Sequence, residues 1–149
     1  MKRLLAAAAL IFAACAKPRP GDIPTVHFGV DTCARCGMAV SEERFASGWV
    51  AEAGHSVVFD DVGEFVEAVR GQPGLARLAF VHDAEDGRWL RADDAYFIQI
   101  RGLATPMGTG FAAFASEARA RSFGRKLGAE GTPVKLESMV AASSGGRNG

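Results

Sequence analysis

Two thiols and a thioether lie within six residues of one another, in the segment Cys33-Ala34-Arg35-Cys36-Gly37-Met38. Thiolate and thioether sulfur are soft donors, and the metal ion that they select most naturally is Cu(I). Gly37 lets the backbone bend between Cys36 and Met38, because glycine adopts conformations that other residues avoid. The segment therefore predicts a soft-metal site, although a CxxC pair also serves zinc sites, disulfides and redox motifs.

A second methionine stands in a turn much later in the chain, within Thr105-Pro106-Met107-Gly108-Thr109-Gly110. The proline before it stiffens the turn and the glycine after it permits the bend. Such a setting exposes the side chain; the alternative is a methionine that fills a gap in the core. We expect the two segments to hold Cu(I) jointly. The expected ligands are Cys36, Met38 and Met107, with Cys33 as a further or alternative thiolate.

Three histidines are dispersed along the chain, at positions 27, 55 and 82. His55 is the best-placed nitrogen donor, because it lies in a turn between two expected strands and close to the CxxC segment. A solvent-facing turn histidine is the alternative for this position. The sequence shows no recognisable Ser-His-Asp catalytic constellation and no HExxH run, so we do not expect an enzyme.

The first fifteen residues have the form of a bacterial secretory leader. Lys2 and Arg3 precede the apolar run 4–14, which is too short to span a bilayer as a helix. The run ends Phe12-Ala13-Ala14-Cys15, which resembles the lipobox of bacterial lipoproteins, so residues 1–14 are the expected signal peptide. Cys15 is the expected lipid-modified residue; an ordinary signal peptide cut after an alanine is the alternative. Ala16 after the cysteine favours the outer membrane, facing the periplasm, by resemblance to Gram-negative lipoproteins.

The composition allows one domain with a packed core. The chain has 149 residues, of which 48% are hydrophobic, and a formal net charge of +0. A chain without a basic excess gives no reason to expect nucleic-acid binding. The proline-containing stretch 15–30 predicts an extended tether, and residues 141–149 predict a disordered tail.

The pattern between these ends predicts an α+β domain over residues 31–140, made of two ββαβ repeats over about 31–83 and 88–140. The expected elements of the first repeat are strands 44–51 and 56–59, a helix over 62–70 and a strand over 78–82. Those of the second, which Trp89-Leu90 introduces, are strands 95–100 and 111–114, a helix over 117–127 and a strand over 133–136. The sulfur segments fall on loops, where metal ligands are both held and reachable.

Two aspartates follow the second expected strand, in Phe59-Asp60-Asp61. They stand where a helix begins, so we expect them to cap that helix and not to bind metal. Oxygen ligands suit harder cations than Cu(I). On this view their replacement costs about 1 kcal/mol of stability and leaves Cu(I) affinity intact.

These segments together resemble the NosL family, the copper-binding accessory lipoproteins of nitrous oxide reductase. The resemblance covers residues 33–136 and includes the leader, CxxCGM, Phe59-Asp60-Asp61, Trp89 with Ala95-Tyr96, Pro106-Met107-Gly108 and 111–116. It implies a periplasmic, membrane-anchored metallochaperone that passes Cu(I) to the assembly machinery of nitrous oxide reductase. Whether the metal is shared in a dimer stays open.

The CxxC pair has three alternative functions. A thiol–disulfide oxidoreductase places its CxxC at the start of a helix, and the residues after Cys36 open a helix poorly. A structural zinc site needs four nitrogen or sulfur ligands, so two of the scattered histidines would have to converge. A plain disulfide closes so short a loop that it stabilises the fold by only roughly 2 kcal/mol.

Overall fold

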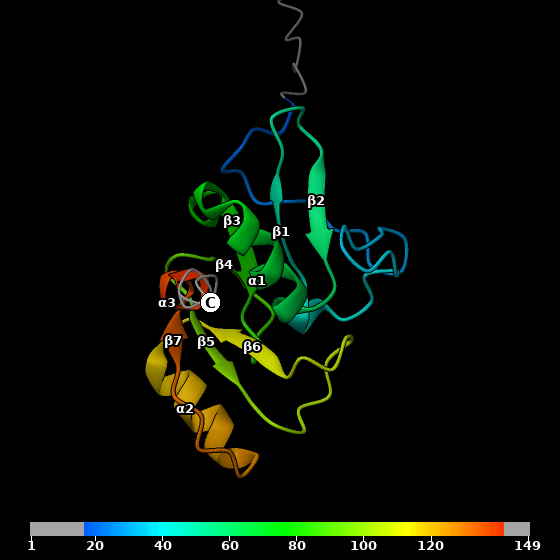
Figure 1. The fold of residues 1–149 in the computed structure, drawn as a ribbon. Helices are drawn as coiled ribbons and strands as arrows, with labels where there is room; N and C mark the ends of the chain where they lie inside the picture. Colours follow the sequence, from blue (N-terminus) through cyan, green and yellow to red (C-terminus); the bar gives the residue numbers. More distant parts are fainter. Residues whose placement is uncertain (1–16, 142–149) are drawn as a thin grey trace, which may run out of the picture.

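The structure is a computed structural model that describes residues 17–141. The expected signal peptide, the lipid-modified Cys15 and nearly all of the expected tail lie outside the described residues. Figure 1 shows two small sheets, one above the other in this view.

The first sheet has four antiparallel strands in the order β2-β1-β3-β4. Its central strand β1 is buried along its whole length, and Gly48 within it lies against β2. A Cβ at that position would come within 2.3 Å of the Val57 carbonyl oxygen, so only glycine fits. The strands are β1 Ser47–Val50, β2 Ser56–Phe59, β3 Ala79–His82 and β4 Trp89–Arg91.

The second sheet has three strands in the order β6-β5-β7, which repeats the order β2-β1-β3 of the first. The strands are β5 Tyr96–Gln99, β6 Phe111–Phe114 and β7 Val134–Lys135. Helix α2 Glu117–Lys126 connects β6 to β7, as α1 Val62–Gly71 connects β2 to β3. The expected α+β class with two ββαβ units is confirmed.

Helix α1 forms because its apolar residues recur at helical spacing. Val62, Phe65, Val66 and Val69 are all buried. The ring of Phe65 meets two aromatic rings of the first sheet, those of Trp49 and Phe59, with centroids 6.5 and 6.1 Å away. The helix starts at the Asp61 carboxylate, which accepts a hydrogen bond from the Gly63 N–H at 2.8 Å. The start of α1 is therefore fixed directly after β2.

The two units share their cores. Phe45, from the 3₁₀ helix η1 Glu43–Phe45, packs in the core of the second unit. In the opposite direction, Phe97 and Leu136 of the second unit pack in the core of the first. Asp83, directly after β3, forms a parallel bridge with Ala113 of β6. The repeats therefore form one compact domain.

Several expectations about element boundaries need correction. Trp89-Leu90 belongs to β4 of the first sheet and not to the second repeat. The last strand stops at Lys135, and it is followed by α3 Leu136–Ala141, a helix that the sequence pattern did not predict. A short second 3₁₀ helix, η2 Pro73–Arg77, precedes β3. The α3 helix packs against α1, and the guanidinium of Arg70 donates to the Met139 carbonyl oxygen at 3.0 Å.

The end of the expected tether is part of the fold. The Thr25 N–H donates to the Ser56 hydroxyl at 2.9 Å, and the Gly29 N–H donates to the Val40 carbonyl oxygen at 2.8 Å. Between these residues, the Phe28 ring lies 6.1 Å from the buried His82 ring. In residues 17–141, no helix has the length and apolar character needed to cross a membrane.

Candidate metal site

The CxxCGM segment is a hairpin-like loop closed by main-chain hydrogen bonds. Thr32 and Ala39 form an antiparallel bridge, and the Cys33 N–H donates to the Met38 carbonyl oxygen at 2.8 Å. At the turn itself, Gly37 has a φ of +76°, in the left-handed region that favours glycine. The glycine between Cys36 and Met38 therefore has the role that the sequence predicts for it.

Two contacts fix this loop against the first unit. The Ala34 N–H donates to the Val58 carbonyl oxygen of β2 at 2.8 Å. The Arg35 guanidinium pairs with the Glu64 carboxylate in the first turn of α1 at 2.8 Å. The loop therefore lies where β2 ends and α1 begins.

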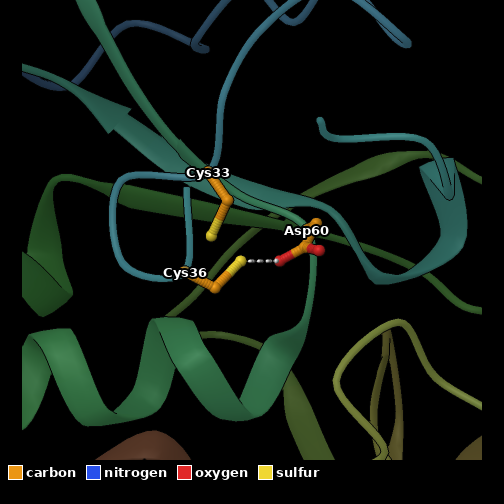
Figure 2. A group of neighbouring side chains, drawn as sticks. All are labelled: Cys33, Cys36 and Asp60. Carbon is orange, nitrogen blue, oxygen red and sulfur yellow. Dashed lines mark hydrogen bonds between the residues drawn. The ribbon is translucent and has the colours of Figure 1, made fainter. Parts of the chain in front are cut away.

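The two thiols and a carboxylate converge at this junction. The ligand atoms of Cys33, Cys36 and Asp60 lie within 4.8 Å of one another, and Figure 2 shows the three side chains turned toward one point. Cys33 and Asp60 are buried, whereas Cys36 is partly exposed. The Cys36 thiol donates a hydrogen bond to the Asp60 carboxylate at 3.5 Å. This is the one such cluster of possible metal-binding side chains in residues 17–141.

The surroundings keep the Cys36 thiol protonated in the absence of metal. Burial raises its pKa to about 11, and the neighbouring Cys33 and Asp60 act in the same direction against a backbone hydrogen bond from Met38. A thiol with a raised pKa is a poor nucleophile at neutral pH. It becomes a strong ligand only when a metal ion displaces the proton.

The two expected thioether ligands are accessible to solvent. Met38 is 53% exposed and Met107 is 38% exposed, which is uncommon for side chains of their size. The loop that carries Met107 is held beside the cysteine loop through Asp61, whose carboxylate accepts a hydrogen bond from the Met107 N–H at 3.0 Å. Asp60, the preceding residue, contacts Cys36. Figure 1 shows both loops on the same side of the molecule.

The structure does not bring the histidines to this cluster. His55 is exposed and precedes β2, whereas Asp60 follows it, so the two residues lie about 16 Å apart at the usual strand rise. His27 is exposed and pairs with Asp31 at 3.2 Å. His82 is buried, with its ring 3.6 Å from that of Trp89, and burial lowers its pKa.

Asp60 lies in the cluster, although the sequence predicted it only as a cap of the helix. The expectation that both aspartates cap the helix is right for Asp61, while the described hydrogen bond of the Asp60 side chain is with Cys36. The segment Phe59-Asp60-Asp61 contains the signal that separates the two aspartates. Strand residues alternate between faces, so two consecutive carboxylates at a strand end point in different directions.

The fold and the cluster define a small α+β protein that presents sulfur ligands from a loop at the junction of a strand and a helix. The family model NosL matches residues 27–139, and the chain belongs to the NosL family. The predicted resemblance is thereby confirmed, and the family is not one of enzymes, as expected.

A solved structure has the same fold. It is the crystal structure of the copper chaperone NosL from Shewanella denitrificans, with a TM-score of 0.63 and 16% sequence identity. The match covers 79% of this chain and 95% of that chain. At this identity the likeness is one of fold. No curated protein matches the sequence.

Proposed function

We propose that this chain is a copper chaperone, which binds Cu(I) at the cysteine loop and transfers it to another protein. The observation that carries the proposal is the convergence of the two thiols of the cysteine loop with the Asp60 carboxylate, within 4.8 Å of one another. The same loop also presents the exposed thioether of Met38. Membership of the NosL family and a fold shared with a protein described as a copper chaperone support it.

The chemistry of the donors favours Cu(I). Cys36 is the strongest ligand, because a thiolate is an anionic sulfur that is partly open to solvent. Met38 and Met107 supply neutral sulfur, and Cys33 supplies a second thiolate from the buried side of the loop. A set of soft ligands that solvent can reach suits a metal that has to be released. The closed tetrahedral cage of a structural zinc site does not.

Two observations weigh against a thiol–disulfide oxidoreductase. The cysteine loop is a hairpin, so its CxxC pair does not itself open a helix as it does in such an enzyme. The pKa of Cys36 is raised to about 11, whereas the attacking cysteine of such an enzyme has a lowered pKa.

We further propose that the protein works in the periplasm, anchored to the membrane through lipid on Cys15, with the outer membrane favoured. The leader sequence supports this placement. The recipient would be the copper-centre assembly machinery of nitrous oxide reductase, as the family resemblance implies. A lipid anchor followed by the short stretch before Thr25 would keep the sulfur loops within reach of such a partner.

Anaerobic titration of the reduced protein with Cu(I), in competition with a chelator of known affinity, tests the proposal. We expect tight binding by the parent protein and loss of tight binding in Cys36→Ser. Met139→Leu is the matched control for leucine variants of Met38 and Met107, because Met139 is buried in the core. X-ray absorption should show sulfur as the dominant neighbour of copper. A parent protein that reduces insulin but binds Cu(I) weakly would support the oxidoreductase instead.

A further inference from the structure

The Asp61 carboxylate does more than cap a helix. Its side chain is fully buried, and it accepts one hydrogen bond from the N–H of Gly63 in α1. The remaining three come from the loop around Met107. Thr105 donates its hydroxyl at 2.6 Å, Met107 its N–H at 3.0 Å, and Thr109 its hydroxyl. An ordinary N-cap needs only the first of these four interactions.

Shape complementarity adds to these hydrogen bonds. Thr109 packs on Gly63 so closely that a Cβ at position 63 would come within 2.6 Å of three Thr109 side-chain atoms. The first turn of α1 is therefore the surface on which the Met107 loop packs. The loop is the long connection between β5 and β6. Within it, the Gly110 N–H lies 3.3 Å from the Thr105 hydroxyl.

The same strand-to-helix junction faces both sulfur segments. Asp60 accepts from the Cys36 thiol, and the next residue, Asp61, accepts from the backbone of Met107. Consecutive side chains at the end of β2 thus contact the two parts of the expected ligand set. No other described interaction of a charged side chain links the Met107 loop to the first unit.

We propose that Asp61 is a positioning residue that holds the Met107 thioether at the copper site; this inference rests on the proposed function. The carboxylate fixes the backbone at Met107, and the backbone fixes where its thioether can reach. Under this proposal, replacing Asp61 weakens Cu(I) binding, which is contrary to the expectation from the sequence.

Asp61→Ser separates the two roles of this carboxylate. Serine still caps a helix, but its short side chain cannot reach the loop donors. We expect Cu(I) affinity to fall at least tenfold, and X-ray absorption to show one fewer sulfur neighbour. Because both changes would remove the same ligand, the double variant Asp61→Ser, Met107→Leu should bind within about twofold of Met107→Leu alone.

Thr105 gives a gentler test that keeps the buried carboxylate. Thr105→Val removes the hydroxyl at nearly constant volume, whereas Thr105→Ser retains it. We expect the valine variant to weaken Cu(I) binding and the serine variant to restore it. Ser116→Ala is the control for lost capping, because Ser116 caps α2 far from the loop and its removal should leave Cu(I) affinity unchanged.

The outcomes distinguish this inference from the function on which it rests. If the parent protein binds Cu(I) tightly and Asp61→Ser binds it equally well, positioning by Asp61 is wrong while the chaperone proposal stands. Losses that multiply in the double variant would also overturn it. A folded parent protein that does not bind Cu(I) would overturn both.

Discussion

The Cys36 thiol has to lose its proton before its sulfur can bind Cu(I). Its pKa is raised to about 11, so at neutral pH the metal competes with a proton for the same sulfur. Asp60, buried beside it, already accepts the hydrogen bond from the thiol. For the proposed Cu(I) site, this chemistry predicts an affinity that depends on pH.

Cu(I) affinity should rise with pH between about pH 6 and 8. For one thiolate ligand the rise is about tenfold per pH unit, and for two it is about a hundredfold, because each thiol releases one proton on binding. Competition with a chelator calibrated at each pH measures the slope. Cys33→Ser tells the cases apart: the slope should drop from two to one if Cys33 is a ligand. An affinity that stays flat over this range would exclude a protonated Cys36.

The sulfur ligands could be proposed from residue types and spacing, because softness belongs to the side chain and needs no tertiary structure. Asp60 and Asp61 could not be assigned in the same way. Which partner a carboxylate meets depends on loops that are 24 and 46 residues away in sequence, as the contacts with Cys36 and Met107 show. His55 shows the converse: it is close to the CxxC segment in sequence, but it precedes β2, whereas Asp60 of the cluster follows β2.

At the level of the elements, the first turn of α1 has to accept the Met107 loop. Gly63→Ala should therefore destabilise the protein by about 1–3 kcal/mol, because the new methyl group overlaps Thr109, which is itself hydrogen-bonded to Asp61. Cu(I) affinity should fall as well, since the loop has to move. Denaturant unfolding and Cu(I) competition measure the two effects.

Gly71→Ala provides the matched control in the same helix. A Cβ at position 71 meets no atom within 4 Å, and the residue has no positive φ. The free energy of unfolding of Gly71→Ala should equal that of the parent protein or exceed it by up to about 1 kcal/mol, because alanine has the higher helix propensity. Its Cu(I) affinity should be unchanged. Equal stability and equal Cu(I) affinity of Gly63→Ala and Gly71→Ala would contradict the packing of the Met107 loop on α1.

The repeated units were predictable because apolar residues with periods of two and 3.6 mark strands and helices directly. The Val62, Phe65, Val66 and Val69 pattern gave α1 almost to its ends. Short elements carry too few residues for a period, which explains why α3 was missed after β7. The pairing of β4 with β3 could not be assigned either, because Trp89-Leu90 is compatible with an edge strand of either sheet.

The whole molecule depends on contacts between the two units, and Asp83 is central to them. Its side chain has no exposed surface, and its carboxylate accepts from the Ala115 N–H and from the Arg119 guanidinium, each at 2.9 Å. Asp83 follows β3 of the first unit, while Ala115 and Arg119 flank the start of α2 in the second. Together with the shared cores, this connection predicts that both units unfold together.

Asp83→Ala should lower the free energy of unfolding by about 2–3 kcal/mol, because it removes several hydrogen bonds to a buried charge while Arg119 keeps Asp86 and Glu85 as partners. Arg121→Ala is the control: its pair with Glu117 is exposed and should contribute at most about 1 kcal/mol. Both tryptophans lie in the first sheet, so their fluorescence reports the first unit, while far-UV circular dichroism also reports α2. The two signals should shift together in Asp83→Ala. A circular dichroism change that precedes the fluorescence change would mean that the second unit unfolds alone. The Met107 loop could then leave the proposed copper site while the cysteine loop stays folded.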